Sequence, residues 1–149
     1  MARIVVRALG AADRARWTAL WAGYNAFYGR AALPAEISEQ TWQRMLDPAE
    51  PVHGLVAEEG GEVVGLAHYL YHPSTISLGP SCYLQDLFTD ERMRGRGVGR
   101  ALIQAVYGEA ARAGAARVYW QTHETNTAAQ GLYDQVAERS GFIVYRKLL

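Results

Sequence analysis

Residues 89–103 decide the fold, and they read Thr89-Asp-Glu-Arg-Met-Arg-Gly-Arg-Gly-Val-Gly-Arg-Ala-Leu-Ile103. The run Tyr83–Phe88 before them is typical of a buried strand, and apolar residues recur at helical spacing from Val98 onward. Glycines let backbone N–H groups turn toward a ligand, and a first helical turn adds unpaired donors with a partial positive charge. The stretch therefore predicts a phosphate or pyrophosphate site, with a tight turn carrying solvated arginines as the alternative.

Two common phosphate motifs do not fit this stretch. A P-loop ends in Gly-Lys-Ser/Thr, whereas Gly99 is followed by Arg100 and Ala101. A dinucleotide fingerprint needs Gly-x-Gly-x-x-Gly early in a βαβ unit, with an acidic residue further on. Gly95, Gly97 and Gly99 have a different spacing and lie beyond the midpoint of the chain.

The pattern Arg94-x-x-Gly97-x-Gly99 instead resembles the acetyl-CoA pyrophosphate loop of the GNAT superfamily of N-acetyltransferases, written Arg/Gln-x-x-Gly-x-Gly/Ala. The resemblance covers the chain from about Arg3 to the C-terminus, because the order of strands, helices and motifs also fits.

A second stretch is similar to a later block of the same family. It reads Asn126-x-x-Ala129-x-x-Leu132-Tyr133, followed by Gly141-Phe142. Seven residues separate Tyr133 from Gly141, more than is usual in the family, so the helix there is longer or is followed by a loop. The ending also resembles a bacterial subgroup that acetylates histones or polyamines.

Length and composition limit the class of protein. The 149 residues predict one domain, residues 1–149, that is large enough to bury a core. Fifteen basic and fifteen acidic residues give a net charge of zero, which disfavours a nucleic-acid partner. Cys82 is the only cysteine, which excludes an intramolecular disulfide and a Cys-rich zinc site. The sequence predicts neither a signal peptide nor a membrane span, and hence a cytoplasmic protein.

The order of elements predicts an α/β fold. Strands are expected at residues 3–8, 52–58, 62–71, 83–88, 116–122 and 142–147. Helices are expected at residues 13–28, in a short segment capped by Ser38, from Val98 to near Gly114, and at residues 126–139. The resemblance implies a single-domain GNAT fold: a mixed sheet, antiparallel in its N-terminal half, with splayed central strands and about four flanking helices. The acyl-CoA arm would lie between the splayed strands.

The resemblance also implies how acetyl-CoA is bound. The main chain of Leu87, Phe88 and Thr89 would pair with the pantetheine arm, and Asn126 would hydrogen-bond its amides or simply cap the last helix. The pyrophosphate would be held by the glycine loop with its arginines, which comprises Arg94, Gly95, Arg96, Gly97, Val98, Gly99 and Arg100.

Tyr133 is the family's usual general acid toward the departing thiolate, although it could instead pack the last helix onto the sheet. The general base is less clear from the sequence. Some relatives carry a glutamate where this chain has Gln85, which cannot accept a proton. Asp86 is the neighbouring carboxylate, but adjacent strand residues face opposite sides, so it could be the base, order the amine or be a buried structural acid. His123 is a second candidate base.

The acceptor side is expected to involve Tyr24, Tyr28, Gln85 and His123. An aromatic stripe that includes both tyrosines could line an acceptor pocket or belong to the core. His68 and His72 lack a clear third ligand, so no metal site is predicted. The sequence thus predicts an acetyl-CoA-dependent N-acetyltransferase that acts on a small amine, polyamine or amino acid by direct attack in a ternary complex. A protein lysine or N-terminal acetyltransferase and a non-catalytic acyl-CoA sensor are the alternatives, and analogy with the family favours a homodimer.

Overall fold

A computed structural model describes residues 3–149. Five strands form one sheet in the order β1 (Ile4–Ala8), β2 (Val52–Glu59), β3 (Glu62–His72), β4 (Ser81–Thr89) and β5 (Arg117–Tyr119). β1 to β4 are antiparallel, and β5 runs parallel to β4 after the crossover through α3. The helices are α1 (Arg14–Phe27), α2 (Ala35–Leu46), α3 (Val98–Arg112) and α4 (Thr127–Val136), with short 3₁₀ turns η1 (Ala11–Asp13) and η2 (Glu91–Met93).

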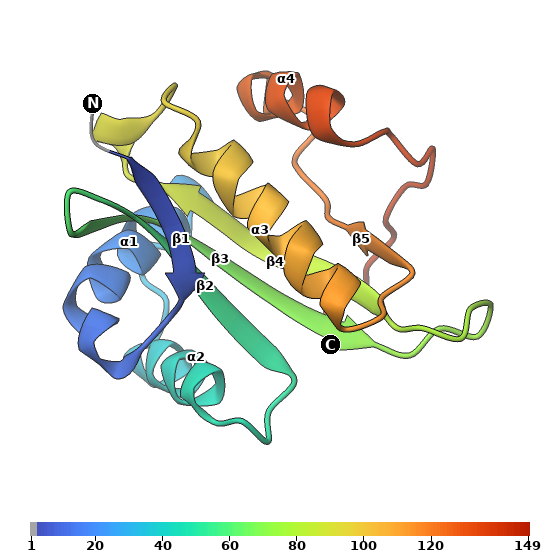
Figure 1. The fold of residues 1–149 in the computed structure, drawn as a ribbon, viewed down its shortest axis with the longest axis horizontal. Helices are drawn as coiled ribbons and strands as arrows, with labels where there is room; N and C mark the ends of the chain where they lie inside the picture. The colour runs from blue at the N-terminus through green and yellow to red at the C-terminus, as the bar shows by residue number, and fades with distance from the viewer. Residues whose placement is uncertain (1–2) are drawn as a thin grey trace.

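The sheet lies between two layers of helix (Figure 1). α1 and α2 cover one face, where Trp17, Trp42 and Leu66 are buried. α3 crosses the other face, where Ile103 and Cys82 are fully buried. The alternation of side chains along β3 feeds both cores, as expected for a strand covered on both faces.

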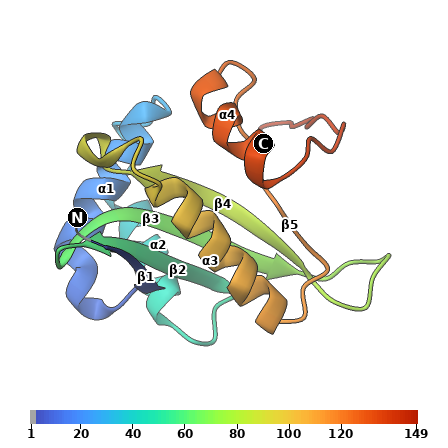
Figure 2. The ribbon, with the colours of Figure 1, turned by 45° about the horizontal axis from the view of Figure 1, so that its top comes forward.

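β4 and β5 separate soon after they meet. Only Ser81–Tyr83 of β4 pairs with Arg117–Tyr119 of β5, so the rest of β4 has β3 as a neighbour on one edge and no strand on the other. After β5 the chain leads away from the sheet to α4, which stands apart from β4 (Figure 2). The predicted splay of the central strands and the predicted α/β fold class are confirmed.

Three predicted elements differ in extent. β5 is shorter than residues 116–122, because the chain leaves β4 after Tyr119. α4 ends at Val136, because Ala137 adopts an extended backbone. Ser38 does not cap α2, which begins after Pro34; its hydroxyl accepts a hydrogen bond from the Trp21 indole instead.

The predicted strand at residues 142–147 is wrong. A strand needs a partner for its backbone groups, and the end of the chain lies beside none. Its apolar side chains are largely exposed: Phe142, Ile143, Val144 and Tyr145. Between Tyr133 and Gly141 the chain stays in α4 as far as Val136 and then forms a loop, so of the two possibilities the helix followed by a loop is the one observed. None of the described helices is long and apolar enough to cross a bilayer.

Gly65 on β3 allows the first turn of α3 to rest directly on the sheet. A Cβ there would lie 2.8 Å from Val98 Cγ1 and 3.2 Å from the backbone oxygen of Phe88. Gly65→Ala should therefore lower the free energy of unfolding by about 1–3 kcal/mol in denaturant titrations, the usual cost of overpacking a core.

Gly131→Ala is the matched control. A Cβ at Gly131, in α4, would have no neighbour within 4 Å. Alanine should leave stability unchanged or raise it by up to about 1 kcal/mol, because it favours helix over glycine. Equal stability of the Gly65 variant and the wild type would refute this account of how α3 is seated.

Candidate active site

The glycine loop has the geometry of an anion cradle. Gly95 and Gly97 have φ angles of 78° and 87°, in the left-handed region that glycine tolerates best. Gly97 is the N-cap of α3, and its carbonyl accepts the helix's first i to i−4 bond, from Ala101, at 3.0 Å. The N–H groups of Val98 to Arg100 precede that bond, so helix geometry leaves them without an intrahelical acceptor. They lie at the positive end of the α3 dipole.

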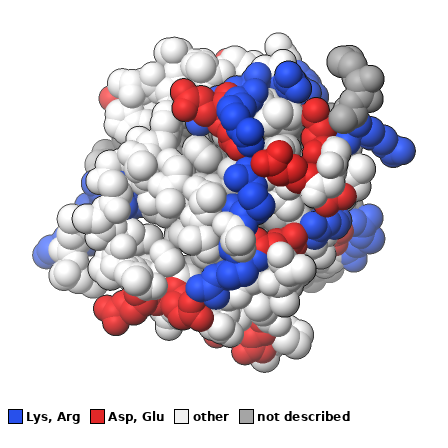
Figure 3. All heavy atoms as spheres, turned by 90° about the vertical axis from the view of Figure 1, so that its left-hand side faces the viewer, with Lys and Arg blue, Asp and Glu red and all other residues white. Residues whose placement is uncertain are grey.

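The arginines around this loop fall into two groups. Arg92 pairs with Asp90 at 2.9 Å and Arg96 with Glu59 at 3.5 Å, so both are engaged by acids. Arg94 instead lies over the Phe88 ring at 5.4 Å, and Arg100 contacts the amide of Gln135. Acidic and basic side chains are interleaved over this side of the molecule (Figure 3). Among the described residues, Arg94 and Arg100 have no carboxylate partner and are the loop arginines best able to meet a phosphate.

The end of β4 offers an open backbone edge beside this loop. Leu87, Phe88 and Thr89 pair with β3 on one side. Their other edge follows the point where β5 has left the sheet. A strand edge of this kind can accept an extended ligand that carries amides.

A β-bulge at Gln85 decides which way Asp86 points. His68 pairs with Asp86 and Tyr69 with Leu84, so Gln85 is the extra residue on β4. As a result Leu84 packs in the α3-side core, whereas Asp86 contacts His68, whose ring packs against Trp17 of α1. Gln85 is exposed. Regular alternation would have placed Leu84 and Asp86 on the same face.

Asp86 belongs to a buried polar group. Its Oδ2 lies 2.9 Å from Nδ1 of His68, and Nε2 of His68 accepts a hydrogen bond from the Trp17 indole at 3.0 Å. The phenol of Tyr24 lies beside the same carboxylate. Burial, and then the charge of Asp86, raise the pKa of Tyr24 well above its usual range, so this phenol stays protonated.

Tyr133 projects from α4 toward Trp120, with ring centroids 5.4 Å apart. Burial, and to a smaller extent the neighbouring phenol of Tyr28, raise the pKa of Tyr133 to about 12. Tyr28 in turn packs on Tyr24, with ring centroids 5.0 Å apart. Tyr24 and Tyr28 therefore connect the surroundings of Asp86 with those of Tyr133.

The other candidate residues make contacts of their own. Asn126 is the N-cap of α4, where its Oδ1 accepts from the Ala129 N–H at 3.4 Å, so the capping role is present. His123 contacts the hydroxyl of Thr125 in the exposed loop before α4. His72 contacts the hydroxyl of Tyr119. Burial raises the pKa of Cys82 to about 11, which keeps its thiol protonated at neutral pH.

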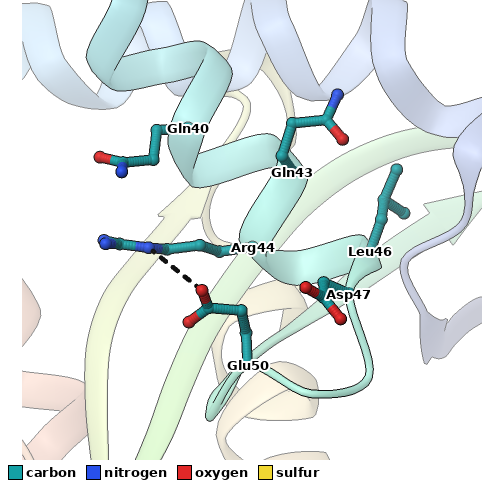
Figure 4. Close-up of a pocket in the computed structure, with 6 residues that line it drawn as sticks. All are labelled: Gln40, Gln43, Arg44, Leu46, Asp47 and Glu50. Atoms are coloured by element: carbon teal, nitrogen blue, oxygen red, sulfur yellow. Dashed lines mark ion pairs between the residues drawn. The ribbon is translucent and has the colours of Figure 1, made fainter.

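A hollow of about 460 Å³ lies elsewhere, at the end of α2 (Figure 4). Gln40, Gln43 and the weak ion pair of Arg44 with Glu50, at 3.9 Å, line much of it. None of the predicted site residues borders this hollow, and neither the glycine loop nor the open edge of β4 reaches it. We assign it no role in catalysis.

Comparison with known proteins identifies the family. The sequence profile of the acetyltransferase (GNAT) family matches residues 17–137. The chain belongs to this family. D-amino-acid N-acetyltransferase HPA3 of Saccharomyces cerevisiae is 37% identical over 147 residues, which cover 97% of this chain and 91% of that protein. The uncharacterized N-acetyltransferase YhfO of Bacillus subtilis is 32% identical over 142 residues, 94% of each chain.

Solved structures share the GNAT fold. The aminoglycoside acetyltransferase AAC(6')-Iy, in complex with the bisubstrate analogue CoA-S-monomethyl-acetylneamine, superposes with a TM-score of 0.83 at 20% identity and covers 99% of both chains. A ribosomal-protein-alanine N-acetyltransferase from Brucella melitensis superposes with a TM-score of 0.76 at 18% identity, covering 99% of this chain and 100% of that one. The predicted family and the assignment of the chain as an N-acetyltransferase are confirmed.

Sequence reasoning missed three residues of this GNAT site. From the sequence, His68 had no expected role beside Asp86 and Trp17 was placed only on the aromatic stripe; the contact of His68 with Asp86 depends on the bulge at Gln85, for which the sequence carries no local signal. Arg30 lies in the loop after α1, with its guanidinium over the rings of Tyr28 at 5.2 Å and Tyr24 at 5.6 Å. Arg30 reaches the two rings because the loop after α1 folds back toward that helix, and the sequence gives no sign of this loop conformation.

Proposed function

We propose that this GNAT protein transfers an acetyl group from acetyl-CoA to the primary amine of a small molecule, by direct attack in a ternary complex. The observation that carries the proposal is the pairing of a buried carboxylate with a protonated phenol. Asp86 and Tyr133 flank the packed pair Tyr24 and Tyr28, near the place where β4 has lost its neighbour. Residues 1–149 would form one such catalytic domain.

The glycine loop and the β4 edge fit the two polar parts of acetyl-CoA. The N–H groups of Val98, Gly99 and Arg100, with the side chains of Arg94 and Arg100, would hold the pyrophosphate. The backbone of Leu87 to Thr89 would pair with the pantetheine amides. The remaining part of the predicted set, Gly95 to Gly97 and Asn126, would shape the loop and contact the pantetheine. The complex of the aminoglycoside N-acetyltransferase AAC(6')-Iy with CoA supports this choice of co-substrate.

The reaction follows from the positions of the two proton-transfer groups. Asp86 takes a proton from the acceptor amine, directly or through a water, and the amine nitrogen attacks the thioester carbonyl. A backbone N–H of β4 polarises that carbonyl as its oxygen gains charge. The new C–N bond forms and the C–S bond breaks, and Tyr133 gives its proton to the departing thiolate. The products are an amide and the CoA thiol, and solvent restores both residues.

The acceptor pocket favours a small amine and suits an amino acid in particular. Tyr24 and Tyr28 offer ring faces, and Arg30 over both rings has no carboxylate partner among the described residues. Arg30 could bind an acceptor's carboxylate while Asp86 meets its amine. The printed name of the yeast relative, a D-amino-acid N-acetyltransferase, supports this class. His123 and Gln85 remain candidates for more distant acceptor contacts.

We also propose a homodimer. β5 ends the sheet, so its outer edge has no strand partner among residues 3–149. The apolar side chains of residues 142–145 are exposed and also lack a partner. A second copy of the chain could cover both features, because a free strand edge and an extended apolar segment are complementary.

Acetyl-CoA should raise the melting temperature, because it would bind only the folded loop. At a hundred times its dissociation constant the gain is about 2.7 kcal/mol. Gly97→Val should abolish that gain, since valine cannot keep the φ of 87° that orients the loop amides. Gly60→Val in the β2–β3 turn, at φ 60°, is the control: it adds similar strain but should keep the full ligand shift. Equal shifts in both variants would overturn the loop assignment.

Tyr133→Phe removes one oxygen and keeps the ring that packs on Trp120. Folding and acetyl-CoA affinity should stay near wild type, while turnover falls by one to four orders of magnitude, at about 1.4 kcal/mol each. Thiol release should be measured with a panel of amines, polyamines and amino acids. Full activity with intact stability would make Tyr133 a packing residue. No thiol release from the wild type with any acceptor would favour the non-catalytic sensor.

The dimer has its own test. Replacing Phe142 and Val144 by serine should convert the protein to a monomer in sedimentation experiments, because the variant loses the apolar contact between copies. Ile37→Ser, at an exposed site on α2, should leave the dimer intact. A monomeric wild type at micromolar concentration, or a dimeric double-serine variant, would contradict this interface.

A further inference from the structure

A buried chain of hydrogen bonds runs from α1 to Asp86. The Trp17 indole N–H donates to Nε2 of His68 at 3.0 Å, and Nδ1 of His68 lies 2.9 Å from Oδ2 of Asp86. Trp17, His68 and Asp86 are 1%, 2% and 9% exposed. These hydrogen bonds connect three elements, α1, β3 and β4, and the proposed base, Asp86, is the last residue of the series.

The chemistry of the indole fixes the protonation of His68. An indole nitrogen can only donate, so Nε2 of His68 must offer its lone pair. A proton on Nε2 would point at the indole N–H and would break that bond. The ring proton therefore sits on Nδ1, where it donates to Asp86. Trp17 thus selects one neutral tautomer of His68.

We propose that Trp17 and His68 are positioning residues for the general base. The Nδ1–H of His68 holds Oδ2 of Asp86 and leaves Oδ1 to take the proton of the acceptor amine. The inference rests on the proposed function, and specifically on Asp86 as the base.

That His68 is neutral matters as much as the direction of its hydrogen bond to Asp86. An imidazolium in the same place would form an ion pair with Asp86 and make the carboxylate a poorer proton acceptor. A neutral N–H donor orients the carboxylate without cancelling its charge. The groups that face the His68 ring are the indoles of Trp17 and Trp21 and the carboxylate of Asp86, with the Tyr24 phenol beside that carboxylate. Trp17 therefore protects the basicity of Asp86 by occupying the second nitrogen.

Two substitutions at His68 separate positioning from packing. Asparagine can place its amide N–H near the position of Nδ1, whereas leucine has a similar size and no donor. Both lose the acceptor for Trp17, so they share that cost. His68→Leu should lower kcat by roughly 10- to 100-fold, a part of what general-base catalysis contributes, with the KM for acetyl-CoA unchanged. His68→Asn should recover most of that loss. Equal kcat in the two variants would show that His68 only fills the core.

Asp86→Asn separates failure of this inference from failure of the proposed function. If Asp86 is the base, this variant should lose roughly 10²- to 10⁴-fold in turnover, and adding His68→Leu should cost little more, since both act through one group. Near wild-type turnover of Asp86→Asn would remove the base and with it the role of His68. A large loss in Asp86→Asn together with equal His68 variants would overturn only the positioning role.

A spectroscopic test needs no variant to fold. Nitrogen-15 NMR of the wild-type protein at neutral pH should show His68 protonated at Nδ1 and unprotonated at Nε2. A proton on Nε2 would overturn the assignment of Trp17. Trp17→Phe should then lower kcat several-fold, because Nε2 becomes free to take a second proton. Trp42→Phe is the matched control: its ring packs on Trp17 from α2, and no contact with His68 or Asp86 is seen among the described residues, so kcat should stay near wild type.

Discussion

β4 keeps β5 as a neighbour over only three residues, and the free edge that follows governs the rest of the site. Backbone N–H and C=O groups lose free energy when they are buried without partners, so an open edge inside a protein calls for water or for a ligand that carries amides. The backbone groups of β4 that face β3 are paired with it, whereas those on the opposite edge beyond Tyr83 have no strand beside them. The chain beyond Tyr119 cannot close the edge, because Trp120 packs on Tyr107 and Tyr133 rather than beside β4. The proposed pantetheine contact uses this constraint.

The same edge fixes where the glycine loop must lie. The chain leaves β4 at Thr89, and the Asp90 N–H still bonds to the Val64 carbonyl on β3 at 2.8 Å. Asp90 then bridges Arg16 of α1, at 3.0 Å, and Arg92. Its pKa is held well below the usual range, chiefly by the hydrogen bond from Arg92, so this brace stays charged at neutral pH. The ion pairs of Asp90 and the close packing of α3 on Gly65 together hold the N-terminus of α3 beside the end of β4.

Sequence patterns predicted the parts that depend on local chemistry. The glycines of residues 95–99 predicted a loop with the geometry of an anion cradle, and the apolar periodicity of residues 98–112 predicted α3. Both patterns are local, because each depends on the conformation of the same residues that carry it. The orientation of Asp86 could not be predicted in this way. Strict alternation assigns it to one face, and the bulge at Gln85 assigns it to the other. The strand expected at residues 142–147 failed for a related reason: its residues have strand propensity, but a strand also needs a neighbouring strand, and none of the described strands pairs with this segment.

Asp86 and Tyr133, the two groups proposed to transfer protons, would face opposite demands, and their surroundings in the fold differ. Burial favours the neutral form of any acid, which suits Tyr133: its phenol packs on Trp120, and both burial and Tyr28 raise its pKa. A base needs the reverse. Asp86 is also buried, but the N–H of His68 donates to it, and among the described residues no buried side-chain nitrogen or oxygen lacks a partner. The hydrogen bonds that lead from Trp17 through His68 give the Asp86 carboxylate a polar partner, whereas the Tyr133 phenol lies against aromatic rings, and the proposed division of roles rests on this difference.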